Sequence, residues 1–309
     1  MATSASVLEH RVVAEGLAFP EGPVVMPDGS VIVVEIAGPR LTRVHPDGTT
    51  TVVAEWDDPA SAGPNGAALG PDGAMYVCNN GGFIWSDRGL RFPGERATGA
   101  NQSPAYVTGS IDRVDLDTGT ITTLYDQCDG HRLCGPNDLV FDGHGGFWFT
   151  DLGKQRQWDV DKGGVFYAKA DGSSVARRVP SIDHPNGCGL SPDGSTLYVA
   201  QTTTGRLWAY DVVAPGELAN PRGRCIANTL GSLDSLAVEA DGTVVVAALR
   251  DGLLVVRPDE THEFLAVDGP LITNVAFAGE GPTTAYLTES GIGSLLAIDW
   301  PRPGLALAH

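Results

Sequence analysis

Six polar residues stand at one fixed position of a pattern that recurs along the chain, and each of them carries a side-chain oxygen. They are Glu21, Asn65, Asn137, Asn186, Asp234 and Asn274. In each repeat the polar residue is followed by a short apolar run, a turn that usually contains Asp-Gly, and a β-rich run. Carboxylate and amide oxygens that converge on one point are the ligands that hard cations such as Ca²⁺ and Mg²⁺ prefer. The pattern predicts a cation site if the fold brings these positions together.

A purely structural role is the alternative for this position. Asn and Asp ahead of a strand often cap turns through their own side chains, which accounts for Asn65 and Asn274. It accounts poorly for Glu21 and Asp234, because glutamate is a weak turn former and converging carboxylates repel one another. The two acids therefore favour the cation site.

The spacing of the polar position indicates which fold can gather these residues. Successive members are 44, 72, 49, 48 and 40 residues apart, and a period of about forty to fifty residues is typical of a β-propeller blade. The one long interval holds an extra tract, at about 81–106, and removing it restores the period. In a propeller the innermost strands run side by side around a central channel. Residues at the same end of all six strands then converge on one rim.

The sequence thus predicts an all-β fold, a six-bladed β-propeller with four-stranded blades. One domain spans residues 1–309 and carries an inserted loop at about 81–106. Asp28-Gly29 and Asp47-Gly48 are typical of the hairpin turns expected within a blade. The last repeat lacks an outer strand, which the N-terminal segment "HRVVAEG" can supply to close that blade. A β-sandwich with incidental Asp-Gly turns is the alternative, and six in-phase repeats argue against it.

Composition narrows the possible partners and compartments. The chain has 309 residues, a formal net charge of −18 and no Lys/Arg cluster, so its surface would repel nucleic acid and anionic membranes. No apolar stretch approaches the roughly 20 residues that span a bilayer, and the N-terminal sequence has no secretory signal. The five cysteines contain no C-x-x-C pair; Cys128 and Cys134 can bridge only in an oxidising setting. We expect a cytoplasmic protein with a small-molecule partner.

Several other chemistries lack their motifs. The sequence has no G-x-S-x-G nucleophile elbow, no H-E-x-x-H zinc motif, no G-x-G-x-x-G dinucleotide motif and no P-loop. A serine hydrolase, a zinc protease and a nucleotide-binding enzyme are therefore not indicated.

Four segments resemble the SMP-30/gluconolactonase/luciferin-regenerating-enzyme family. They are "FPEGP", "GPNDLVFDGHGGFWFTD", "HPNGCGLSPDGSTLYVA" and "LDSLAVEADG". Members of that family are six-bladed propellers that hold one divalent cation, and many hydrolyse lactones of sugar acids or other small cyclic esters. The resemblance covers about residues 15–300. It implies one cation here, with Ca²⁺ as the first candidate and Zn²⁺, Mg²⁺ or Mn²⁺ as the others.

The resemblance also implies roles for the residues that match the family by position. It makes Glu21, Asn186 and Asp234 metal ligands, with Asp234 also the candidate general base. Asn137 falls where the family places a residue that touches both the metal shell and the substrate.

Further residues lie beside this set. Asn65 and His184 are candidate substrate contacts, Asp138 can orient Asn137, and Ser235 can add an oxygen. Polar residues at or near the ends of second strands can also reach the pocket, namely Asn80, Asp151 and Glu289.

The chain departs from the family at one position and adds an insertion. Animal gluconolactonases of this family carry an arginine two residues before the Asn, where this chain has Gly135, and Arg132 lies out of register. The resemblance therefore implies the metal site without the sugar-acid contact. The inserted tract contributes Phe83, Trp85, Arg88, Arg91, Phe92 and Arg96. It forms either an aromatic and cationic lid over the rim or a surface loop.

Together these patterns predict a metal-dependent hydrolase of a small lactone. The cation would polarise the ring carbonyl, and Asp234 or a metal-bound water would deliver the nucleophile. Two alternatives remain: a non-catalytic propeller that serves as a binding platform, and a family member with a different small-molecule reaction at the same metal site. Strictosidine-synthase-like propellers lack the metal cage, and the joint presence of Glu21, Asn186 and Asp234 argues against them.

Overall fold

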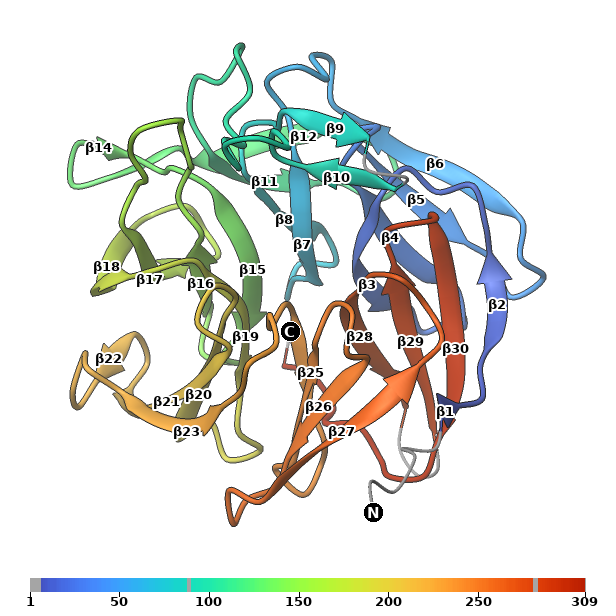
Figure 1. The fold of residues 1–309 in the computed structure, drawn as a ribbon. Helices are drawn as coiled ribbons and strands as arrows, with labels where there is room; N and C mark the ends of the chain where they lie inside the picture. Colours follow the sequence, from blue (N-terminus) through green and yellow to red (C-terminus); the bar gives the residue numbers. More distant parts are fainter. Residues whose placement is uncertain (1–6, 88–89, 280–282, 309) are drawn as a thin grey trace.

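The computed structural model describes residues 7–87, 90–279 and 283–308. Across these ranges the secondary structure consists of strands and turns without a helix, and six sheets surround a central axis (Figure 1). The prediction of an all-β, six-bladed propeller is confirmed. Nothing in the described part of the chain is a helix long and apolar enough to cross a bilayer.

Each blade is a meander in which the chain starts at the axis and moves outward. The innermost strands are β3 (Pro20–Val25), β7 (Pro64–Leu69), β15 (Pro136–Phe141), β19 (Pro185–Leu190), β24 (Leu236–Val238) and β28 (Ile272–Ala278). The second strands are β4 (Val31–Glu35), β8 (Met75–Asn79), β16 (Gly146–Asp151), β20 (Thr196–Gln201), β25 (Val244–Ala247) and β29 (Thr283–Glu289).

Two outer strands complete each blade. The third strands are β5 (Arg40–Val44), β11 (Ser110–Val114), β17 (Gly163–Lys169), β21 (Arg206–Ala214), β26 (Leu253–Val256) and β30 (Ser294–Trp300). The fourth strands are β6 (Thr50–Glu55), β12 (Ile121–Tyr125), β18 (Val175–Ile182), β23 (Arg224–Asn228), β27 (His262–Val267) and β2 (Arg11–Ala14). In the last blade, β2 from the start of the chain pairs antiparallel with β30.

The expectation of four strands in every blade is not met uniformly. β1 (Val7–Leu8) adds a parallel strand beside β27, and β22 (Glu217–Leu218) pairs with the long β21. Two small hairpins lie outside the blades, β9 (Trp85–Asp87) with β10 (Arg91–Pro93), and β13 (Gln127–Cys128) with β14 (His131–Arg132). The two added strands, β1 and β22, pair with backbone groups of blade strands that would otherwise be unpaired.

Hairpin turns and thiols follow the expectations from composition. At the first Asp-Gly turn, Gly29 has a φ of +82° and Asp28 Oδ1 accepts the Ser30 N–H at 3.0 Å. All five cysteines are free, including Cys128 and Cys134.

The apolar core lies between neighbouring blades. In the largest described cluster, the rings of Phe141, Phe147, Phe149 and Phe166 from blade three pack with Tyr76 from blade two. The Tyr76 and Phe141 rings form a T-shaped, edge-to-face pair with centroids 5.0 Å apart. Because each interface is built from alternate residues of two sheets, the blades hold one another at fixed angles around the axis.

The innermost strands come so close at the axis that some positions admit no side chain. A Cβ added at Gly22 would lie 2.6 Å from the Asn65 carbonyl oxygen, and one added at Gly187 would lie 2.6 Å from Ser235 Cα. Neighbouring innermost segments also bond directly, since the Gly187 N–H donates to the Asp234 carbonyl at 3.3 Å. Glycine at these positions is therefore a requirement of close backbone approach.

This requirement predicts the cost of adding one methyl group. Gly187→Ala should lower the free energy of unfolding by about 3 kcal/mol, because neighbouring backbone must move. Gly194→Ala is the matched control: its φ is +70° but nothing lies within 4 Å of the added carbon, so it should cost only about 1 kcal/mol. Urea unfolding of both variants measures the difference. Equal costs would show that the axis can relax and that the close approach is not rigid.

Candidate active site at one end of the channel

A backbone irregularity aims the repeated polar residues at the axis. In five blades the pairing between first and second strands shifts register at the polar residue or directly beside it, as between Glu21 and Val24 or between Pro185 and Cys188. Such a bulge turns a side chain out of the regular strand alternation. In the remaining blade Asp234 and Ser235 precede β24, and the Asp234 N–H donates to the Ala247 carbonyl at 2.8 Å.

Three acids meet where these segments converge. Burial raises the pKa of the Glu21 carboxyl, and hydrogen bonds from Asn274 and the Gly22 N–H offset part of that effect. Burial together with the nearby Glu21 carboxyl raises the pKa of Asp234 well above its usual range. The same two causes raise the pKa of Asp138 to about 7. The fold thus brings together like charges that repel one another in the absence of a cation.

Amide and hydroxyl groups complete the cluster, which we call the axial cage: Glu21, Asn137, Asp138, Asn186, Asp234, Ser235 and Asn274. Asn274 Nδ2 donates to Glu21 Oε2 at 2.8 Å. Asn186 Nδ2 donates to Thr202 Oγ1 at 3.1 Å, which leaves Asn186 Oδ1 facing Ser235 Oγ at 3.5 Å.

One atom of the cage lacks a partner although it is buried. Asn137 Oδ1 accepts no hydrogen bond, and the residue is only 3% exposed. A buried acceptor without a donor is unfavourable unless something else satisfies it. An oxygen atom of this kind beside two or three carboxyls fits a hard cation well. The described residues contain no group of three His, Cys, Asp or Glu side chains placed to hold a metal, so amide oxygens would have to share the coordination.

Sequence reasoning underestimated Asp138. It was expected only to orient Asn137, whereas the structure buries it in the cage beside Glu21. The repeat contains a signal for this: the residue after the polar position is Gly22, Gly66 and Gly187 in three blades. Where the neighbouring backbone leaves no room, that position is glycine, so an acid there must point into the cage.

The remaining predicted contacts lie on the rim. Asn65 is buried at the start of β7. His184 is partly buried and has a φ of +48°, a strained conformation for a residue with a side chain. Burial lowers the pKa of its imidazole, which keeps the ring neutral at pH 7. Asp151 and Glu289 do not reach the pocket, because their carboxylates accept backbone N–H groups such as Gly135 and Leu271, at 2.7 and 2.8 Å.

The inserted segment packs across the rim. Phe83, Trp85 and Phe92 pack on Phe19 and Leu271. Trp85 and Phe19 form an edge-to-face pair with ring centroids 5.2 Å apart. These partners come from the first and last blades, so the segment covers one side of the end where the cage lies.

The arginines expected for a cationic lid are described only in part: Arg96 is exposed, whereas Arg88 and the side chain of Arg91 lie outside the described part of the structure. A lysine from another segment, Lys154, is buried against the insertion.

The opposite end of the channel is different in character. A cavity of about 760 Å³ opens there, lined by apolar residues such as Leu190 and Phe277, and the C-terminal stretch 305–308 lies along it. Asp138 and Cys188 also line this cavity. The axial cage therefore lies between this apolar cavity at one end of the channel and the polar rim at the other end.

The family model for the SMP-30/Gluconolactonase/LRE-like region matches residues 19–291. The chain belongs to this family. The matched range includes all six repeated polar positions and the insertion.

Curated relatives and solved structures agree with that assignment. Lactonase drp35 of Staphylococcus saprophyticus is 28% identical over 247 residues, which are 78% of this chain and 65% of the relative. The chain thus matches slightly less than two thirds of that protein's length. A gluconolactonase of Zymomonas mobilis is 25% identical over 301 residues, 88% of this chain and 77% of the relative. The structure of a gluconolactonase from Xanthomonas campestris superposes with a TM-score of 0.73 at 25% identity, covering 96% of this chain and 92% of that one.

The crowded acids predict how the metal-free protein responds to pH. The folded-state pKa of Asp138, about 7, lies above the ordinary aspartate pKa of 3.8, so its stabilising contribution is complete at low pH and is lost as the pH rises through 7. Asp138→Asn removes that ionisation and should raise the free energy of unfolding in chelator at pH 8 by up to about 4 kcal/mol. Thermal unfolding at pH 5 and pH 8 measures it.

The control for that experiment is Asp183→Asn. Asp183 is exposed on the same rim and pairs with Lys162 at 2.8 Å. Its replacement should change stability little at either pH. If Asp138→Asn behaves like this control in chelator, the carboxyls do not repel one another in the folded protein.

Proposed function

We propose that this protein is a metal-dependent lactonase whose reaction takes place at the axial cage. Two observations carry the proposal together: Glu21, Asp138 and Asp234 converge, and Asn137 Oδ1, at the same position of the repeat as Glu21 and Asp234, is buried without a partner. Charge repulsion and an unsatisfied acceptor are both relieved by one divalent cation. The names of the relatives, lactonase and gluconolactonase, support a lactone as the substrate class.

Glu21, Asn186, Asp234 and Asn137 would hold the cation, with Ca²⁺ as the first candidate because every donor is an oxygen. When bound, the cation supplies Lewis-acid polarisation of the lactone carbonyl and offsets negative charge on its oxygen. Two acids and two amides leave more net positive charge on the ion than an all-carboxylate site would.

The chain's own contribution is proton transfer and positioning. Asp234 retains some exposure, and its carboxylate accepts the proton of the attacking water as the water oxygen bonds to the carbonyl carbon. The ring carbon–oxygen bond then breaks, and the same proton passes to the alkoxide that leaves. Burial and the nearby Glu21 carboxyl raise the pKa of Asp234 in the metal-free protein, which favours a carboxyl group that can both take and return a proton.

Substrate choice differs from that of the animal enzymes. A Cβ at Gly135 would lie 2.9 Å from the Gly153 carbonyl oxygen, so no arginine fits at this position without a backbone shift. Asn137, Asn65 and His184 would then contact the substrate, with no positively charged side chain at position 135. We infer a small lactone bound by neutral groups.

The test compares two isosteric variants. Glu21→Gln should lower the cation stoichiometry because the cage loses a charge. Asp234→Asn should lower kcat about a thousandfold even in protein that retains the cation, because an amide can ligate but cannot accept a proton. Elemental analysis and a lactone panel, each with and without chelator, measure both effects.

Asp183→Asn is again the matched control, because it removes a rim acid outside the cage. Turnover by Asp234→Asn at the wild-type rate would overturn the mechanism. A wild type that binds a cation but hydrolyses no lactone would point to a different small-molecule reaction at the same site. A wild type that binds no cation would instead favour the binding platform.

A further inference from the structure

One backbone hydrogen bond recurs at the rim and defines a second tier of residues beside the axial cage. The residue that follows a second strand donates its N–H to the carbonyl of the residue just ahead of the first strand. The bonds are Ile36 to Phe19, Asn80 to Gly63, Leu152 to Gly135, Thr202 to His184 and Ser290 to Leu271, at 2.8 to 3.1 Å. Asn80 therefore occupies the same place in its blade as four other residues do in theirs.

The polar members of this tier contact the cage or its supports. Thr202 Oγ1 accepts the hydrogen bond from Asn186 Nδ2. Ser290 Oγ donates to the Pro20 carbonyl at 2.6 Å, next to Glu21. By the symmetry of the repeat, Asn80 stands at this level beside Asn65.

The Asn80 amide has a fixed orientation. Its Oδ1 receives the Gly82 N–H at 3.1 Å and Lys154 Nζ at 3.0 Å. Because both partners are donors, the oxygen must be the atom that faces them. Nδ2 then points elsewhere, and it has no hydrogen-bond partner although the residue is only 1% exposed.

The neighbouring strand-end side chains are different, because they are satisfied by the protein. Asn79 Oδ1 accepts the N–H groups of Gly63 and Gly81, and Asn79 Nδ2 donates to Asp112. Asp151 and Glu289 accept backbone N–H groups in the same way. Asn80 keeps an unused donor at this rim.

Lys154 is the residue that holds Asn80 in place. Its side chain is fully buried, and Nζ also donates to the Gly82 carbonyl at 2.8 Å and lies 4.3 Å from the Phe83 ring centroid. Burial lowers the pKa of the Lys154 amine to about 7, and the hydrogen bonds from Nζ hold its two oxygen partners in place. Both partners lie where the insertion leaves β8.

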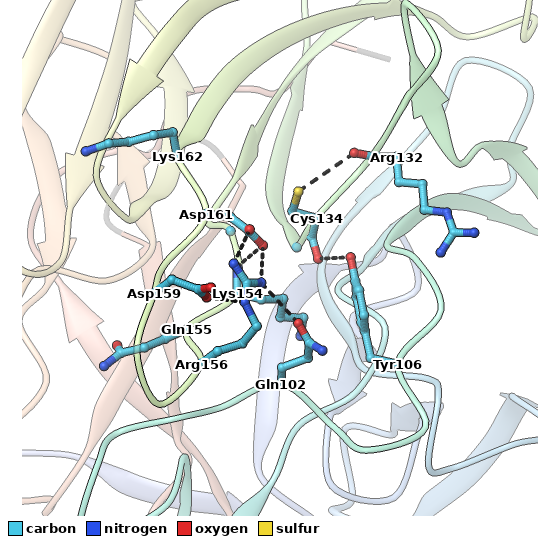
Figure 2. Close-up of polar contacts among 12 residues, drawn as sticks. Gln102, Tyr106, Arg132, Cys134, Lys154, Gln155, Arg156, Asp159, Asp161 and Lys162 are labelled. Carbon is cyan, nitrogen blue, oxygen red and sulfur yellow. Dashed lines mark hydrogen bonds and ion pairs between the residues drawn. The ribbon is translucent and has the colours of Figure 1, made fainter.

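The loop that carries Lys154 is tied to the far end of the insertion. Gln155 and Asn101 exchange two hydrogen bonds, at 2.8 and 2.9 Å. Arg156 joins Gln102 to Asp161, as Figure 2 shows, and the Tyr106 hydroxyl donates to the Cys134 carbonyl beside them. The insertion and the loop therefore form one roof, with Asn80 at its inner edge.

We propose that Asn80 Nδ2 is a substrate-binding donor that takes an oxygen of the bound lactone, and that Lys154 is the positioning residue that orients it. The inference rests on the proposed function for the identity of the ligand. An N–H group can be satisfied only by an acceptor, so the matching atom is a carbonyl, ring or hydroxyl oxygen and not a cation. A fixed buried donor discriminates strongly against analogues that lack the oxygen.

Asn80→Asp is the decisive variant. A carboxylate keeps both acceptor contacts and adds a charge pair with Lys154, so the fold should be at least as stable, but the donor is lost. We expect kcat/KM for the best lactone of the panel to fall at least tenfold, mainly through KM, with cation content unchanged. Asn80→Ala should fall at least as far.

Lys154→Met tests positioning, and Asn101→Ala is the matched control. Lys154→Met should raise KM in the wild-type background but have no added effect in Asn80→Ala, because Lys154 acts through Asn80. Asn101→Ala removes the acceptor for the Gln155 N–H and loosens the roof without touching the donor, so it should change KM less than twofold.

Two outcomes overturn the inference while the proposed function stands. Asn80→Asp within twofold of wild type would mean that Nδ2 meets only water. Equal losses in Asn80→Asp and Asn101→Ala would mean that roof rigidity alone matters.

If wild type hydrolyses no lactone, the proposed function fails separately, and titration with 2-piperidone, a lactam with the same carbonyl geometry, decides the role of Asn80. Binding by wild type that Asn80→Asp weakens at least tenfold supports it. Equal binding by the two proteins, or none by wild type, overturns it.

Discussion

The close approach of the innermost segments at the propeller axis is the constraint on which the site depends. Where Gly22 and Gly187 face a neighbouring strand, even a methyl group would collide with backbone. The side chains of residues next to these glycines therefore lie close to one another, whatever their charge. Glu21, Asp138 and Asp234 are held within mutual influence by the packing of six blades, and the cost of that arrangement is met by the interfaces between blades. A less tightly closed ring would let the acids separate, and the incentive to bind a cation would be lost.

The two ends of the channel differ in polarity. At the lower end the strands continue as apolar side chains around a wide cavity, along which the C-terminal stretch lies. At the upper end the strands begin with bulges, which turn polar side chains inward. The innermost strand runs in the same direction in every blade. Each repeat therefore places its polar residue at the same end of the channel and its apolar residues at the other end. The insertion then breaks the symmetry at the polar end only, by packing Trp85 and Phe92 against the first and last blades.

Much of the fold and of the axial cage could be predicted from the sequence, because equally spaced repeats in the chain become blades around one axis. The polar residue at one fixed position, followed by an apolar run and a turn, was enough to predict the propeller and to place Glu21, Asn186 and Asp234 at one end. Asp138 was undervalued because a single Asn-Asp pair is typical of a turn. Only the glycines at the equivalent position in other blades indicate that its side chain has nowhere else to go.

Contacts between segments that do not share the repeat could not be predicted. Lys154 follows β16 in the third blade and meets Asn80 and Gly82 after β8 in the second. No periodicity relates these residues, and a lysine in a polar loop is normally solvated. The insertion was equally ambiguous, since its aromatic residues suit a surface loop as well as a packed roof. Whether the insertion packs on the rim depends on an apolar partner there. Phe19 and Leu271 form that partner, but they come from the first and last blades and meet only in the closed propeller.

Polar side chains at the ends of second strands therefore have a structural role in some blades and a role in ligand binding in others. Asn79, Asp151 and Glu289 end second strands, and their side-chain oxygens accept backbone N–H groups of the adjoining loops. These bonds hold the loops that carry the tier of Asn80, Thr202 and Ser290. In two blades that tier supports the cage through a hydroxyl group, which needs one partner and finds it in the protein. The Asn80 amide has one polar group more than the protein satisfies, its Nδ2 donor. The hydrogen bond from the buried Lys154 side chain to Oδ1 fixes the orientation of that donor. A rigid, unsatisfied donor adds nothing to the stability of the empty protein, so its place beside the cage is understood best as preparation for a ligand.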